Sequence, residues 1–183
     1  MSTHRHAPIE LDRDCEATVI PGGQRLTLAR GERVLVTQAL GGSLTVQTDQ
    51  GHLVRIDERD AIALGIVGTE ADEEPVDSGP FELQMVIEQL KTVFDPEIPV
   101  NVVDLGLIYA CDALPLPDDG HRIEIKMSMT APGCGMGDVL RDDARSRVLP
   151  IAGVSDVDVE LVWDPPWDPS RMSDAARLEL GML

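Results

Sequence analysis

Residues 121–137 read HRIEIKMSMTAPGCGMG, and this stretch decides how the second half of the chain folds. Apolar Ile123, Ile125, Met127 and Met129 alternate with polar side chains, which is the pattern of a strand with one buried face. Residues 130–137 then supply one proline, three glycines and one cysteine before a helical pattern begins. The stretch therefore predicts a strand, a glycine-rich loop and a helix in direct succession.

The cysteine of this loop, Cys134, precedes the predicted helix by a few residues. Unsatisfied N–H groups and the positive end of the helix dipole favour a thiolate at such a position. The thiolate is the form that attacks electrophiles and binds metals. Two interpretations stay open on spacing alone, a functional thiol and an incidental cysteine in a turn. The loop positions that accompany the thiol are Thr130, Pro132, Gly133 and Gly135.

The residues around this stretch predict the rest of an α/β domain. Apolar residues recur every three or four positions over 83–94, which predicts a helix from Pro80 to the residues before Pro96. Further strands are expected at 107–111 and 154–161, with a helix between them that Asp138 caps and Pro150 ends. The order is helix, strand, strand, helix, strand, and a three-stranded sheet with helices on one face packs it economically. A last short helix is expected over 172–180.

The first half of the chain has a different pattern, in which four or five short strands alternate with glycine-containing turns up to about residue 66. It predicts a small all-β module over 15–69, so the fold class is α+β. Residues 1–14 are expected to be a flexible arm, because they are polar and aperiodic. The acidic segment 70–79, EADEEPVDSG, is expected to be a linker to the α/β domain at 80–183.

The charge of the chain excludes some classes of partner. Its 183 residues contain 33 Asp and Glu against 15 Lys and Arg, a formal net charge of -18. Such a surface repels phosphate backbones and anionic membranes, so no nucleic-acid or membrane partner is expected. No apolar run reaches the roughly 20 residues that span a bilayer, and residues 1–14 lack an apolar signal-peptide core. A cytoplasmic protein with reduced thiols is expected.

The chemistry open to Cys134 depends on its neighbours. A nucleophilic cysteine needs a base within hydrogen-bond reach. His121 lies at the far end of the predicted strand, which leaves His52 as a histidine that could approach through the fold. A metal-binding cysteine needs further ligands, which Cys15, an acidic loop or a second protomer could supply. Incomplete ligation would suit transient binding and hand-over.

Two further segments carry candidate residues. Residues 95–106, DPEIPVNVVDLG, form a stiff acidic loop whose Asp95, Glu97 and Asp104 either flank a site or cap turns. Residues 163–167, WDPPW, contain both tryptophans, which either cover the end of the sheet or dock a partner.

Three of these segments occur in the order found in a known protein family. DPEIPVNVVDLGLIY at 95–109, TAPGC at 130–134 and WDPPW at 163–167 resemble the PaaD/SufT family, also described as MIP-eighteen-like, of iron–sulfur cluster assembly. The resemblance covers about 81–182. The segments DC at 14–15, IPGG at 20–23 and LGGS at 40–43 are similar to the SufT type in particular. The chain has no cysteine after Cys134, unlike PaaD-type members with a cysteine-rich tail.

The resemblance implies a maturation factor rather than an enzyme. It implies the α-β-β-α-β fold and an accessory role in iron–sulfur cluster assembly or in maturing client proteins. Its reactive thiol falls on Cys134, and its acidic loop falls on Asp95, Glu97 and Asp104. Independently of the resemblance, the tail residues Trp163, Asp164 and Trp167 are candidates for docking a partner.

The implied cofactor is iron or an iron–sulfur cluster, held transiently, because the chain lacks the Cys-x-x-Cys pair of scaffold proteins. The implied partners are the assembly machinery, client iron–sulfur proteins and a second copy of this chain. A cysteine-dependent hydrolase or thiol transferase and a non-catalytic binding scaffold remain the alternatives.

Overall fold

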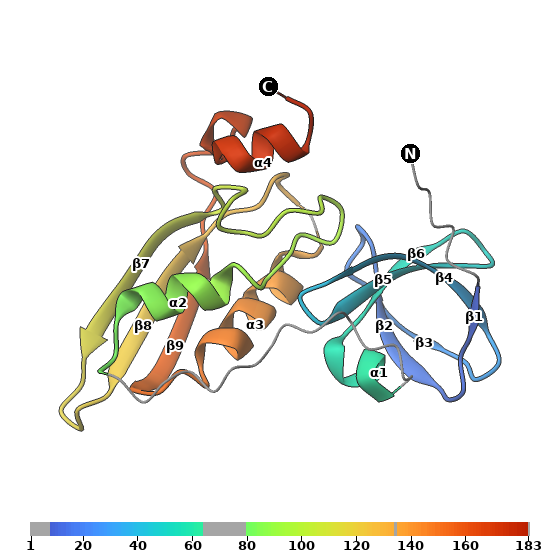
Figure 1. The fold of residues 1–183 in the computed structure, drawn as a ribbon, viewed down its shortest axis with the longest axis horizontal. Helices are drawn as coiled ribbons and strands as arrows, with labels where there is room; N and C mark the ends of the chain where they lie inside the picture. Colours follow the sequence, from blue (N-terminus) through green and yellow to red (C-terminus); the bar gives the residue numbers. More distant parts are fainter. Residues whose placement is uncertain (1–7, 64–79, 134, 183) are drawn as a thin grey trace. The chain divides into compact units, whose positions relative to one another are not determined.

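The chain forms two compact units, Met1–Glu73 and Glu74–Leu183, each with its own β-sheet (Figure 1). The computed structural model describes residues 8–63, 80–133 and 135–182. None of the described helices combines the length and the apolar character needed to cross a membrane.

The first unit is a six-stranded antiparallel sheet with the order β1-β4-β5-β6-β2-β3. The predicted all-β module is confirmed. Residues assigned to a flexible arm already take part in the sheet, because Ile9 pairs with Val34 and Leu11 is only 1% exposed. The elements are β1 (Ile9–Glu10), β2 (Cys15–Val19), β3 (Arg25–Leu28), β4 (Arg33–Leu40), β5 (Ser43–Thr48), β6 (Leu53–Ile56) and the short helix α1 (Glu58–Ala63).

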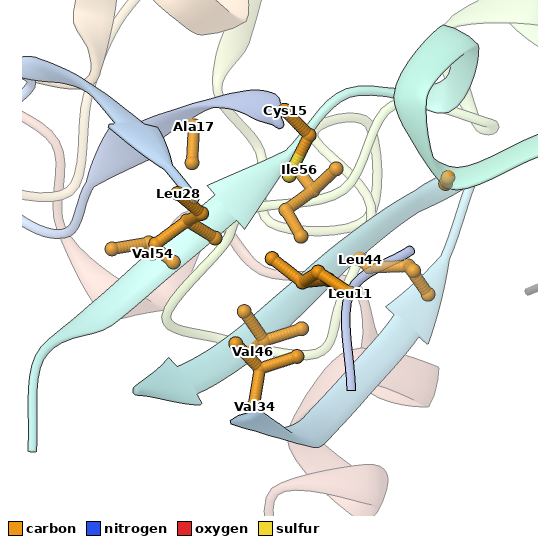
Figure 2. Packing of buried hydrophobic residues seen from close by; sticks show 10 residues of the cluster. Leu11, Cys15, Ala17, Leu28, Val34, Leu44, Val46, Val54 and Ile56 are labelled. Atoms are coloured by element: carbon orange, nitrogen blue, oxygen red, sulfur yellow. The ribbon is translucent and has the colours of Figure 1, made fainter. Parts of the chain in front are cut away.

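Alternation along the strands builds the core of this unit. In β5, Leu44 and Val46 are fully buried and pack with Val54 and Ile56 of the neighbouring β6. Cys15 belongs to the same aliphatic cluster, and Figure 2 shows its side chain pointing toward Ile56. The thiol of Cys15 therefore serves as a small apolar group in the core.

The second unit has the predicted order of elements, and its fold class is confirmed. A three-stranded sheet has the order β7-β8-β9, and α2 and α3 lie on one of its faces (Figure 1). Ile123, Ile125 and Met127 of the central strand are buried, while Glu124 and Lys126 are exposed. The elements are α2 (Leu83–Leu90), β7 (Ile108–Pro115), β8 (His121–Met127), α3 (Gly137–Val148), β9 (Val154–Leu161), the 3-10 helix η1 (Pro169–Arg171) and α4 (Asp174–Glu179).

Two predicted helix boundaries are wrong. Helix α2 ends at Leu90 rather than near Asp95, because the N–H groups of Thr92 and Val93 donate to carbonyls three residues back, Gln89 O (3.0 Å) and Leu90 O (3.1 Å). The carbonyl of Val93 then accepts a hydrogen bond from Val102 N (2.9 Å), where the acidic loop returns. Helix α3 has Met136, not Asp138, as its N-cap. Asp138 lies in the first turn, where it pairs with Arg141 (2.9 Å).

The topology of this sheet gathers the sequence motifs at one edge. Strands β8 and β9 are parallel, so both end at the same edge, and antiparallel β7 begins there. Figure 1 shows α4 beyond that edge. The segment before β7, the loop after β8 and the segment after β9 therefore meet at what we call the motif edge.

Candidate functional site

Three segments form the motif edge. They are the acidic loop (residues 95–107), the cysteine loop (128–136) and the segment 163–173, which we call the strap. Backbone hydrogen bonds join their bases: Ser128 N donates to Leu107 O (2.8 Å), and Val162 N donates to Met127 O (2.9 Å). Motifs that lie far apart in the sequence are thus anchored to adjacent strand ends.

The cysteine loop is anchored at both ends, and most of its described residues between those ends are exposed. Met129 and Met136 are buried, whereas Pro132, Gly133 and Gly135 are exposed and Thr130 is half-buried. Gly133 has φ +77 with nothing within 4 Å of the position that a Cβ would take. Cys134 itself lies outside the described residues.

Asp95 is the buried carboxylate of the acidic loop, only 4% exposed. Its Oδ1 accepts hydrogen bonds from the backbone N–H groups of Glu97 (2.8 Å) and Ile98 (3.0 Å). Burial raises the pKa of Asp95, and these two hydrogen bonds only partly oppose the shift. Asp95 is therefore a turn-forming carboxylate, while Glu97 is exposed.

Asp104 is half-buried and held by a neighbouring amide. The Nδ2 of Asn101 donates to the Asp104 carboxylate (2.7 Å). The Oδ1 of Asn101 accepts from the backbone N–H groups of Val103 (3.1 Å) and Asp104 (2.9 Å). The loop thus presents Asp95, Glu97 and Asp104 in three different environments. Across the described ranges, no three His, Cys, Asp or Glu side chains are grouped to hold a metal ion.

The strap contacts the acidic loop through three consecutive carbonyl groups. Asp104 O accepts from the backbone N–H of Ser173 (2.8 Å), and Leu105 O accepts from the indole Nε1 of Trp167 (2.8 Å). The next carbonyl, Gly106 O, accepts from Nε of Arg171 (3.4 Å). These bonds join residues more than sixty positions apart in the sequence.

A second set of contacts ties the strap to the start of β7. Tyr109 OH donates to Pro165 O (3.0 Å), and the Arg171 guanidinium lies 3.9 Å above the Tyr109 ring. Trp167 is half-buried by its contacts, whereas Trp163 is 45% exposed and Asp164 is exposed. The two tryptophans therefore have different surroundings.

Sequence reasoning missed Arg171 and Ser173 as residues of this edge. Nothing in the polar pattern of 168–173 marks either residue, and their roles come from tertiary contacts. Tyr109 lies within the quoted motif, and its position at the start of a predicted strand is the sequence feature that could have identified it as a residue of this edge.

The other cysteines occupy apolar surroundings. Burial raises the pKa of the Cys15 thiol to about 11, with the carboxylate of Asp60 as the next cause. Burial likewise raises the pKa of Cys111 to about 11. Both positions favour the thiol over the thiolate, which is the ligating form.

The described histidines lie away from the motif edge or in the other unit. His121 is the first residue of β8, at the opposite end of the strand, where its ring stacks on Phe81 (4.3 Å between centroids). His52 belongs to the first unit. Within the second unit, the described part of the motif edge therefore contains no histidine.

Comparison with known proteins identifies relatives of the second unit. The profile of the family described as "Iron-sulfur cluster assembly protein" matches residues 83–161. An Fe-S protein maturation auxiliary factor of Porphyromonas gingivalis is 44% identical over 98 residues, which are 54% of this chain and 90% of the relative. A Bacillus subtilis protein of the same description is 34% identical over 97 residues, 53% of this chain and 91% of the relative.

Two solved structures are also similar to this chain. A domain of unknown function from Bacillus anthracis is 32% identical with a TM-score of 0.48, covering 55% of this chain and 92% of that structure. A conserved hypothetical protein of Thermotoga maritima is 38% identical with a TM-score of 0.47, covering 57% of this chain and 98% of that structure. The sequence matches carry the assignment: with near-complete coverage of the Porphyromonas gingivalis relative at 44% identity, the chain belongs to the iron–sulfur cluster assembly protein family.

Proposed function

We propose that this protein is an accessory factor in iron–sulfur cluster assembly or in the maturation of client proteins, and that Cys134 makes a transient thiolate contact with the cargo. The observation that carries the proposal is the convergence of the acidic loop, the cysteine loop and the strap at one edge of the sheet. Family membership and the names of the relatives support the same role.

The start of α3 supports an ionised thiol. The helix is 12 residues long and begins at Gly137, three positions after Cys134 in the sequence. Its N-cap, Met136, makes no side-chain hydrogen bond to the first-turn N–H groups, unlike the Ser or Asp that usually caps a helix. Donors and a positive dipole end are therefore available at the C-terminal side of the cysteine loop.

The cargo in this proposal is iron or an iron–sulfur cluster, and it is held only in passing. Iron sites require several N, S or O ligands. The described residues of the edge supply exposed Glu97 and half-buried Asp104 as oxygen donors, but no preassembled group of three ligands. We propose that the remaining ligands come from the donor, the client or a second copy of the chain, which favours hand-over. Cys15 has no part in this scheme, because its thiol is buried in the core of the first unit.

Two experiments test the role of the thiol. The first compares cells that lack the gene and carry wild type, Cys134→Ser or Cys111→Ala, with client iron–sulfur enzyme activity as the measurement. The second measures iron and sulfide retained after anaerobic loading with ferrous iron and sulfide. We expect Cys134→Ser to lose both functions, while Cys111→Ala, which changes a cysteine on β7, retains them.

The alternatives make different predictions. A cysteine-dependent enzyme would show turnover of an ester or disulfide substrate that Cys134→Ser abolishes. A binding scaffold would mature clients normally with Cys134→Ala. Client activity at the wild-type level in Cys134→Ser would defeat the proposed thiol contact.

The setting of this activity is part of the proposal. We place it in the cytoplasm with the cluster assembly machinery and client iron–sulfur proteins as partners. Fractionation of cells and co-purification with an assembly scaffold would test that placement.

A further inference from the structure

We propose that the strap is a positioning element of the site, and that Trp167 and Arg171 hold the Asp104 segment of the acidic loop in the geometry that client maturation needs. This inference rests on the proposed function and assigns to residues 163–173 a role in that same site.

The strap binds a run of adjacent acceptors in the acidic loop. Three successive carbonyls of the acidic loop, at residues 104–106, each accept a hydrogen bond from the strap. Their donors differ in kind: a backbone N–H from Ser173, an indole N–H from Trp167 and a guanidinium N–H from Arg171. Three different groups on one short segment thus fix the same three peptide units, which restricts both translation and rotation of the loop.

The backbones of the strap and the acidic loop lie close together at Gly106. Gly106 has φ +70, and a Cβ at this position would overlap the carbonyl oxygen of Arg171. A neighbouring backbone cannot move aside as a flexible side-chain end can. The strap therefore lies directly against the loop at the residue that follows Leu105.

The core and the strap hold the acidic loop through different groups. Buried Val102, Leu105 and Leu107 attach the loop to the core, and Asn101 orients the Asp104 carboxylate. The strap instead binds the backbone carbonyls of residues 104–106, and Trp167 is only half-buried while Arg171 is exposed. Loss of the Trp167 bond should therefore loosen the loop more than it weakens the core.

The chain offers a matched pair of substitutions for the test. Trp167→Phe removes the indole donor and keeps an aromatic ring, while Trp163→Phe makes the same change at an exposed position four residues earlier. Arg171→Lys keeps the charge but removes the planar group stacked on Tyr109. The measurements are amide hydrogen exchange of Leu105 and Gly106, thermal unfolding, client maturation, and the absorption spectrum after anaerobic loading with iron and sulfide.

We expect Trp167→Phe to speed exchange of the two loop amides about fivefold, the factor that one lost hydrogen bond gives. Client maturation should fall by a similar factor and the spectrum of the loaded protein should change, while exchange in β8 stays as in wild type. Arg171→Lys should act in the same direction. Trp163→Phe changes a residue that donates none of the three bonds, so it should leave exchange of the two loop amides as in wild type.

Faster loop exchange with undiminished maturation and an unchanged spectrum would overturn the proposal, because the strap would then be only structural. Unchanged loop exchange in Trp167→Phe would overturn it as well. If Cys134→Ser matures client proteins normally, only the proposed thiol contact fails. The role of the strap is then still decided by Trp167→Phe, which is compared with wild type in the same assay.

Discussion

Gly106 and Arg171 lie 65 residues apart in the sequence, yet the backbone of one leaves no room for a side chain on the other. Gly106 also has φ +70, which disfavours any residue with a Cβ. Two independent requirements thus select glycine at the end of the DLG sequence at 104–106.

Substitution of Gly106 by alanine should destabilise the second unit. We expect Gly106→Ala to cost about 1–3 kcal/mol, because it combines backbone strain with a clash against Arg171 O. Urea unfolding measures the change. Gly133→Ala is the matched control, since Gly133 has φ +77 but open space around it, and should cost only about 1 kcal/mol. Equal losses in the two variants would show that the strap yields to an added methyl group.

Asn101→Asp should make the acidic loop sensitive to pH. The carboxylate retains the acceptor for Val103 N and Asp104 N but replaces the amide that donates to Asp104. Two carboxylates would then face each other, which should lower the free energy of unfolding by about 1–2 kcal/mol at pH 7. The loss should shrink as pH falls through the carboxyl range, since a shared proton restores the missing donor. A pH-independent loss in urea unfolding would contradict this explanation.

Asp95→Asn should stabilise the second unit at neutral pH. Burial raises the pKa of Asp95, so the folded state binds the proton more tightly than the unfolded chain. Stability therefore falls as pH rises from the unfolded pKa, near 3.9, through the higher folded pKa. Asparagine retains the oxygen that accepts from Glu97 N and Ile98 N but has no charge to desolvate.

The measurement for Asp95→Asn is the urea midpoint between pH 3.5 and pH 7. We expect the variant to exceed wild type at pH 7 and to match it at the acid end. Asp95→Ala is the control: it loses both accepted hydrogen bonds and should be less stable than Asp95→Asn throughout. A gain for Asp95→Asn that persists at pH 3.5 would have another origin.

The three cysteines should differ in reactivity. With pKa values of about 11, Cys15 and Cys111 are almost entirely thiols at pH 7.5. We therefore expect iodoacetamide to label Cys134 first, with labelling of the other two rising only above pH 9. Peptide mass spectrometry of the native protein measures the order. Faster labelling of Cys111 than Cys134 at pH 7.5 would argue against an activated thiol in the cysteine loop.

The sequence predicted the strands well, because β8 alternates apolar and polar residues over 123–127 and β9 does so over 157–161. The buried residues Ile123, Ile125, Val157 and Val159 follow this period. Helix ends were predicted less well: Val93 continues the apolar period of α2 but serves the return of the acidic loop. A tertiary hydrogen bond there overrides a local pattern.

The candidate site was predicted only in outline. The motif residues are visible in the sequence, and their meeting follows from the parallel pairing of β8 and β9. The bonds of the strap were not predictable, because an exposed Arg171 resembles any solvated arginine until Tyr109 and Gly106 are placed beside it. The three carboxylates of the acidic loop were grouped by sequence, whereas burial separates Asp95 from exposed Glu97.

The opposite edge of the same sheet has a practical use. The turn between β7 and β8 exposes residues 117–119, and it is separated from the motif edge by a strand of seven or eight residues, roughly 25 Å at ~3.3 Å per residue. An affinity tag inserted into this turn, or a fluorescent dye attached to it, would report on complex formation without blocking the motif edge.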